Sequence, residues 1–148
     1  MEALKWLRSP AARLTAPELA LALEIATSVL SHWDMEAASG TAEYNWNAGG
    51  IGARPGDRYF ASKDAQSVPP SSMAFGAYDD LPGFISDYFG VLALPRYAEA
   101  LSLLMASPKS DGWIRALRKG GYYSADAEVV AAGWAARRAL IVKLTGGH

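Results

Sequence analysis

The chain has 148 residues, of which 51% are apolar, and its formal net charge is −1. This length fits one domain with a core of its own. The near-neutral charge lacks the basic surface typical of nucleic-acid binding, so we expect no nucleic-acid partner. The chain has no cysteine and only two histidines, His32 and His148. We therefore expect neither a metal site nor a cofactor, and any acid–base chemistry falls to carboxylates.

No apolar run reaches the roughly 18 to 20 residues of a membrane span, so none is expected. The first residues lack the basic region, apolar core and cleavage site of a signal peptide. Residues 1–14 are predicted to form an arm or a short helix. Residues 15–145 are predicted to form a single domain.

A long helix is predicted from about residue 16 to about Ala38. Thr15 followed by Glu18 is the pattern of a capping box at its start. Helical spacing places Glu36 on or beside an apolar stripe that is formed by Ala22, Ile25, Val29 and Trp33. We therefore expect the Glu36 carboxyl to be half buried near the end of this helix.

Burial and the negative end of the helix dipole would both raise the pKa of Glu36. A carboxyl that keeps its proton near neutrality can act as a general acid toward a poor leaving group such as a sugar oxygen. The structural alternative is a helix-end carboxylate paired with an arginine. His32, one turn earlier, either tunes this acid or packs in the core through a hydrogen bond. Asp34 lies on a different face of the helix and is a poorer candidate.

Residues 40–78 change in character and are rich in glycine and proline. Two short aromatic segments, 58–62 and 73–78, are predicted to be strands of a small β lobe, with a turn-rich segment between them. Four further helices are predicted: from Asp79 or Asp80 to before Pro95, from Arg96 to Ala106, from Ser110 to Gly120–Gly121, and from Ser124 to about Leu144. The predicted fold class is α+β and mostly α-helical.

One glutamate at the end of a long helix, followed directly by a small β lobe, is the layout of lysozyme-like glycan hydrolases. Motifs in chain order extend the likeness: Glu36–Gly40 (EAASG), Tyr44–Ile51 (YNWNAGGI), Phe75–Tyr78, Arg96–Tyr97 and Gly121–Ser124 (GYYS). On these residues the chain resembles the glucosaminidase-type peptidoglycan hydrolases of glycoside hydrolase family 73. The resemblance implies a lysozyme-like fold.

The resemblance also implies an activity, namely hydrolysis of the β-1,4 bond after N-acetylglucosamine in peptidoglycan glycan strands. Glu36 would be the catalytic acid, and Tyr122 or Tyr123 would reach the cleft while the other belongs to the core. The implied substrate-binding residues are Tyr44, Asn45, Trp46, Asn47 and Tyr78. Trp46 either stacks on a sugar or fills the loop, and the two asparagines either contact substrate or hold the loop through backbone hydrogen bonds.

Glycoside hydrolysis usually needs a second carboxylate. Asp57 is the first choice because it lies in a segment expected to form one wall of the cleft, with Asp64 and Glu43 as alternatives. A substrate N-acetyl group could also supply the nucleophile.

Other functions stay open for such a scaffold. The chain could be a muramidase, a lytic transglycosylase, or a catalytically silent wall-binding or structural module of a phage tail-like assembly. Without a visible signal peptide, we expect a virion or phage-derived particle, or release to the cell wall by a non-classical route.

Overall fold

A computed structural model describes residues 14–36, 47, 49, 51–52, 55, 59–64 and 71–146. Helix α2 spans Ala16–Glu36, as the spacing predicts. At its start the Glu18 carboxylate accepts hydrogen bonds from the backbone N–H (2.8 Å) and the hydroxyl (2.7 Å) of Thr15. The predicted capping interaction is confirmed on the Glu18 side, but the Thr15 hydroxyl donates to the carboxylate instead of accepting a backbone N–H.

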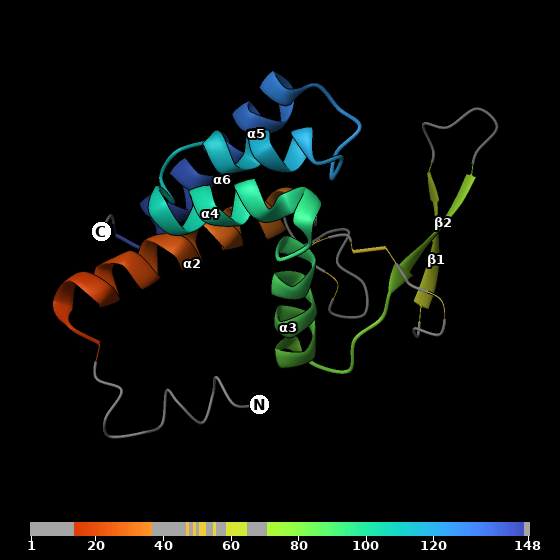
Figure 1. Ribbon diagram of the computed structural model, residues 1–148, viewed down its shortest axis with the longest axis horizontal. Coiled ribbons are helices and arrows are strands. Elements are labelled where there is room, and N and C mark those ends of the chain that lie inside the picture. Colours follow the sequence, from red (N-terminus) through yellow and green to blue (C-terminus); the bar gives the residue numbers. More distant parts are fainter. Residues whose placement is uncertain are drawn as a thin grey trace.

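Two strands form an antiparallel hairpin, β1 (Tyr59–Asp64) and β2 (Ser71–Gly76). Tyr59 pairs with Gly76 at one end of the hairpin, and Asp64 pairs with Ser71 at the other. Figure 1 shows the hairpin to one side of the helical part of the chain. The predicted β lobe is confirmed, although its strands lie about one or two residues from the expected bounds.

Four α-helices follow the hairpin, and a short 3-10 helix separates the first two of them. They are α3 (Leu81–Leu92), the 3-10 helix η1 (Pro95–Tyr97), α4 (Ala98–Ala106), α5 (Gly112–Lys119) and α6 (Ala127–Leu144). The Asp80 carboxylate caps α3 by accepting the N–H of Gly83 at 2.8 Å. Asp126 caps α6 by accepting the N–H of Glu128 at 2.8 Å, so the expectation that Ser124 caps this helix is wrong. An aspartate that directly precedes the helix reaches the free N–H groups better than a serine two residues earlier.

Helices from opposite ends of the chain form the core. Helix α6 packs against α2 and α5, and α5 packs against α4 (Figure 1). The indole N–H of Trp134 donates to the Ser28 carbonyl at 3.0 Å, and the Ser28 hydroxyl donates to the Pro108 carbonyl at 2.5 Å. Glu24 on α2 adds ion pairs to Lys109 (2.9 Å) and Arg138 (2.5 Å). These contacts fix the position of α2, the helix that ends in Glu36.

Among the described residues no single helix has the length and apolar character of a membrane span. Helix α3 and residues 95–106 have them only when taken together, and the two segments are bent by 80° at the break between them.

Candidate active site

Glu36 is the last residue of α2, and its side chain is half buried. Burial raises the pKa of Glu36 to about 7, and the neighbouring Tyr123 hydroxyl offsets part of that effect. Within the described part of the chain no arginine or lysine forms an ion pair with this carboxyl. The expected half-buried carboxyl with a raised pKa is confirmed. Because about half of the molecules carry the proton at pH 7, Glu36 can donate it to a leaving group.

Tyr122 and Tyr123 reach Glu36 from the connection between α5 and α6. Helix α5 ends in a Schellman motif, in which the N–H of Tyr122 donates to the Leu117 carbonyl and that of Gly121 to the Arg118 carbonyl, both at 3.0 Å. Gly121 takes a positive φ of 86°, which glycine adopts without steric cost. The Gly120–Gly121 pair in the sequence thus ends the helix as expected and turns the next two side chains toward α2.

Gly120 is needed for a different reason, which is space. A Cβ atom at this position would lie 2.5 Å from the Arg96 carbonyl oxygen and 2.6 Å from Cδ1 of Tyr97. The backbone of the α5–α6 connection therefore lies directly against η1. This close approach fixes the position of the backbone just before Tyr122.

The two tyrosine hydroxyls have different surroundings. The Tyr122 hydroxyl donates to the Gly49 carbonyl at 2.6 Å, which ties the connection to the loop that follows α2. The Tyr123 hydroxyl is buried and completes no hydrogen bond with a described residue. It still lies near enough to the Glu36 carboxyl for each group to affect the pKa of the other, and burial raises the pKa of Tyr123 well above its usual range. Both tyrosines therefore lie close enough to be affected by the charge of Glu36, and Tyr123 is the one whose hydroxyl also lowers the pKa of Glu36.

His32 is fully buried one turn before Glu36. Its Nδ1 lies 2.9 Å from the Tyr88 hydroxyl on α3, and burial lowers the pKa of His32 to about 3. The ring is therefore neutral at any working pH. The structure supports the interpretation of His32 as a hydrogen-bonded packing residue, and its neutral ring has no charge that could act directly on Glu36.

Asn47 holds the loop that follows α2. Its amide nitrogen donates to the carbonyls of Ile51 (2.8 Å) and Gly76 (3.0 Å), and its Oδ1 accepts the N–H of Ile51 at 2.8 Å. Both amide hydrogens are used by backbone oxygens, and the side chain is only 4% exposed. Asn47 thus joins this loop to the end of β2, which is the loop-holding role considered for it, and its contact with substrate stays a prediction.

Tyr78 lies between the hairpin and α3. Its hydroxyl donates to the Asp87 carboxylate at 2.6 Å, and its ring packs edge-on against Phe84. Asp34 lies on another side of α2 and pairs with Arg137 at 3.5 Å, which agrees with its low rank as an acid. The role of Tyr78 toward substrate stays a prediction.

Several candidate residues lie outside the described part of the chain. These residues are Tyr44, Asn45, Trp46 and Asp57, together with the alternative carboxylate Glu43. Asp64 is the last residue of β1, and its side chain is not among the described parts of the structure. The second catalytic group is therefore still a prediction. No group of three or more potential metal ligands occurs among the residues that the structure does describe.

Sequence reasoning missed two groups that shape this site. The Gly49 carbonyl anchors Tyr122, and the Arg118 guanidinium donates to the carbonyls of Ala125 and, at 3.4 Å, Ser124. Arg118 thereby holds the α5–α6 connection that carries the tyrosines. A backbone carbonyl leaves no trace in the sequence, whereas a basic residue in the last turn before a Gly-Gly pair is a usable signal.

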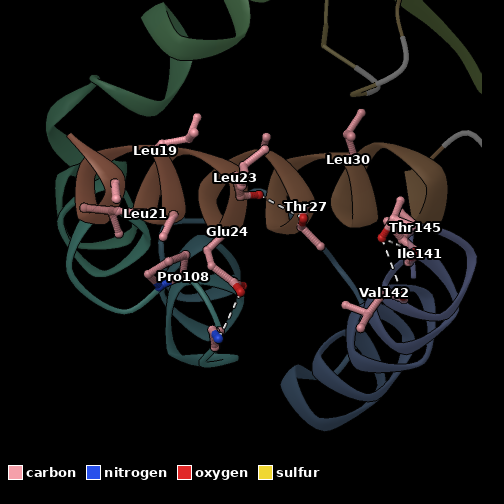
Figure 2. Close-up of a pocket in the computed structure, with 14 residues that line it drawn as sticks. Leu19, Leu21, Leu23, Glu24, Thr27, Leu30, Pro108, Ile141, Val142 and Thr145 are labelled. Carbon is pink, nitrogen blue, oxygen red and sulfur yellow. Dashed lines mark hydrogen bonds and ion pairs between the residues drawn. The ribbon is translucent and has the colours of Figure 1, made fainter. Parts of the chain in front are cut away.

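An apolar groove of about 840 Å³ lies elsewhere on α2, lined also by residues 108–109 and the end of α6. Figure 2 shows Leu19, Leu23 and Leu30 in a row along one side of the helix. The groove contains one carboxylate, Glu24, which is paired with Lys109 and Arg138. These ion pairs lower the pKa of Glu24, which makes it a poor proton donor, so the candidate chemistry belongs to the other end of α2.

No protein-family model matches the sequence, and no curated protein matches it with significant similarity. Solved structures do match. A peptidoglycan hydrolase from Sphingomonas sp. A1 superposes with a TM-score of 0.68 at 20% identity, covering 86% of each chain. A single-residue mutant of that hydrolase gives 0.66 at 19% identity, covering 86% of this chain and 89% of the other.

A third match is the glycoside hydrolase domain of Salmonella typhimurium FlgJ, in a C-terminally truncated form. It superposes with a TM-score of 0.53 at 18% identity and covers 80% of this chain and 83% of the other. The helix, hairpin and helices described above thus follow the arrangement of these solved hydrolase structures. The predicted lysozyme-like fold, mostly helical with a small β lobe, is confirmed as the fold that the chain shares with them.

Proposed function

We propose that this protein hydrolyses β-1,4 glycosidic bonds of peptidoglycan glycan strands as an endo-β-N-acetylglucosaminidase, with Glu36 as the general acid. The observation that carries the proposal is the state of the Glu36 carboxyl, which is half buried, has a pKa raised to about 7, and borders Tyr123. The fold adds support because the solved structures that share it are described as hydrolases.

In the proposed reaction the protonated Glu36 carboxyl donates its proton to the glycosidic oxygen as the bond to the anomeric carbon breaks. The buried surroundings keep the proton on Glu36 until that step. A second carboxylate, for which Asp57 is the first choice, or the substrate N-acetyl group would stabilise the cationic sugar.

The test is digestion of purified peptidoglycan by the wild type and by Glu36→Gln, with mass analysis of the released fragments. Asp34→Asn is the matched control, because it also neutralises one carboxylate of α2 but lies on another face and pairs with Arg137. We expect fragments with a reducing N-acetylglucosamine end from the wild type and the control, and a loss of at least about 100-fold in Glu36→Gln.

The products also separate the alternatives. A reducing N-acetylmuramic acid end would indicate a muramidase, and an anhydro end, lighter by one water, would indicate a lytic transglycosylase. Wall binding without release by any of the three proteins would contradict the hydrolase proposal and favour a structural module. Delivery by a phage-derived particle stays a prediction.

A further inference from the structure

The ring of His32 lies at the centre of an aromatic cluster beneath the candidate active site. Its centroid lies 5.7 Å from that of Tyr88, 5.5 Å from Trp113, 5.4 Å from Tyr122 and 5.9 Å from Tyr123. These four rings come from α3, α5 and the α5–α6 connection. One side chain of α2 thus contacts three other parts of the fold.

The two tyrosines meet His32 in edge-on geometry, with interplanar angles of 66° for Tyr122 and 74° for Tyr123. Edge-to-face packing is directional and favours one relative orientation of the rings. The hydrogen bond between Nδ1 and the Tyr88 hydroxyl fixes the rotation of the His32 ring itself. The bond to α3 therefore fixes the His32 ring, and the fixed ring favours one orientation of each of the two tyrosine rings.

Tyr123 depends on such packing more than Tyr122 does. Tyr122 is anchored by its hydrogen bond to the Gly49 carbonyl, whereas the Tyr123 hydroxyl completes none with a described residue. Among the described aromatic rings, those in contact with Tyr123 are His32 and Tyr122, the latter at 5.1 Å. The segment that carries both tyrosines is not helical. The N–H of Tyr122 is held by the Leu117 carbonyl, whereas no backbone hydrogen bond to Tyr123 is found among the described residues.

We propose that His32 is a positioning residue, whose neutral buried ring holds Tyr122 and Tyr123 against Glu36 and so keeps water away from the acid. The effect of this positioning on catalysis rests on the proposed function. The titratable groups that face the ring are Tyr88 from α3 and the two tyrosines, and none of them is charged at neutral pH. His32 therefore acts through packing and exchanges no proton with Glu36.

The proposal is tested on the folded chain by a carbon-13 NMR titration of the Glu36 carboxyl, which needs no enzymatic activity. His32→Gln keeps a hydrogen-bond acceptor for Tyr88 but removes the ring edges. Water should then reach Glu36, and its pKa should fall by about one unit or more from about 7 toward the ordinary 4.5. The double variant His32→Phe with Tyr88→Phe keeps a ring and leaves no unpaired hydroxyl, so its Glu36 should titrate as in the wild type.

Leu104→Ala is the matched control. Leu104 on α4 belongs to the same core and takes part in none of the hydrogen bonds that hold α2 and in none of the ring contacts around His32. Its loss should lower stability and leave the Glu36 titration unchanged. A folded His32→Gln variant whose Glu36 still titrates near 7, or a folded Phe–Phe variant whose Glu36 has shifted, would overturn the positioning role. If instead the wild type titrates as expected but releases no fragments from peptidoglycan, only the proposed function fails.

Discussion

His32 and Glu36 lie one turn apart on α2, and burial shifts their pKa values in opposite directions. Burial lowers that of His32 from 6.5 to about 3 and raises that of Glu36 from 4.5 to about 7, because in each case it disfavours the charged form. The two groups therefore make opposite contributions to the pH dependence of stability, and these nearly cancel between pH 4.5 and 6.5. Substituting either residue should expose the contribution of the other.

Glu36→Gln should be more stable than the wild type at alkaline pH. Between pH 4.5 and 7 folded Glu36 keeps a proton that the unfolded chain releases, so the free energy of unfolding falls as the pH rises. The glutamine amide does not titrate, so the variant does not lose this stability. At pH 8 its free energy of unfolding should exceed that of the wild type by up to about 3 kcal/mol. Urea unfolding at pH 4 and pH 8 measures this gain. Glu128→Gln is the control of opposite sign: its hydrogen bonds with Arg115 lower the pKa of Glu128, so its neutralisation should lower stability at pH 8 and not raise it.

His32→Gln should be less sensitive to acid than the wild type. Below pH 6.5 the unfolded chain protonates His32 while the folded chain does not until about pH 3, so the wild type loses stability as the pH falls. Glutamine cannot titrate, and the slope that remains should have the opposite sign, set by Glu36. The comparison concerns slopes, because the lost ring also lowers stability at every pH. Parallel pH profiles of the two proteins would contradict the lowered pKa.

Activity on peptidoglycan should fall above pH 7. If Glu36 must be protonated, kcat/KM declines about tenfold per pH unit beyond its pKa of about 7. Initial rates of fragment release from pH 5 to 9, with folding checked at each pH, measure this decline of kcat/KM. A rate that stays flat to pH 9 would exclude Glu36 as the acid of the rate-limiting step.

Gly120→Ala should destabilise the protein by about 1 to 3 kcal/mol or more, since the new methyl group meets a backbone carbonyl at 2.5 Å. Gly90→Ala is the matched control, because Gly90 lies in α3 with nothing within 4 Å of the added atom. It should stabilise the protein by about 0.5 to 1 kcal/mol through helix propensity. Thermal unfolding of both variants measures the difference. Equal effects of the two changes would show that Gly120 is not tightly packed.

Asn47→Ala should cost about 1 to 3 kcal/mol, because it leaves the buried N–H of Ile51 without its acceptor and removes one hydrogen bond each from the carbonyls of Ile51 and Gly76. The Ile51 carbonyl keeps the N–H of Gly76 at 2.9 Å. Asn47→Asp keeps an acceptor for the Ile51 N–H but places an oxygen against two carbonyls, so it should destabilise at least as much. Urea unfolding tests both. A tolerated aspartate would mean that the two carbonyl bonds contribute little.

The parts of the fold that depend on local patterns could be predicted from the sequence. Thr15 with Glu18 gives the start of α2, and Gly120–Gly121 gives the end of α5, because capping and positive φ are properties of a few neighbouring residues. The cap of α6 was assigned to the wrong residue, since Ser124 and Asp126 are both good caps and the choice depends on where the chain leaves Tyr123. Burial is also not decided by residue type alone, since Leu81 is 42% exposed at the first turn of α3, outside the core.

Of the candidate site, the half-buried position of Glu36 and the loop-holding role of Asn47 could be predicted from the sequence. Glu36 follows from helical spacing, which a single helix determines. The bond from Tyr122 to the Gly49 carbonyl and the ring contacts of His32 with Tyr122 and Tyr123 join segments 73 to 91 residues apart in sequence, and no local pattern reports them. Such contacts follow from the packing of the whole domain.

The bonds from α2 to α6 have a consequence for how the protein is made. Ser28 and Glu24 find their partners Trp134 and Arg138 more than 100 residues later in the chain. During translation, at about 5 to 20 residues per second, α2 leaves the ribosome several seconds before α6 can cover it. Until then Ser28 and Glu24 lack these partners. The bonds that hold α2, whose last residue is Glu36, are therefore completed only when synthesis of the domain is nearly finished.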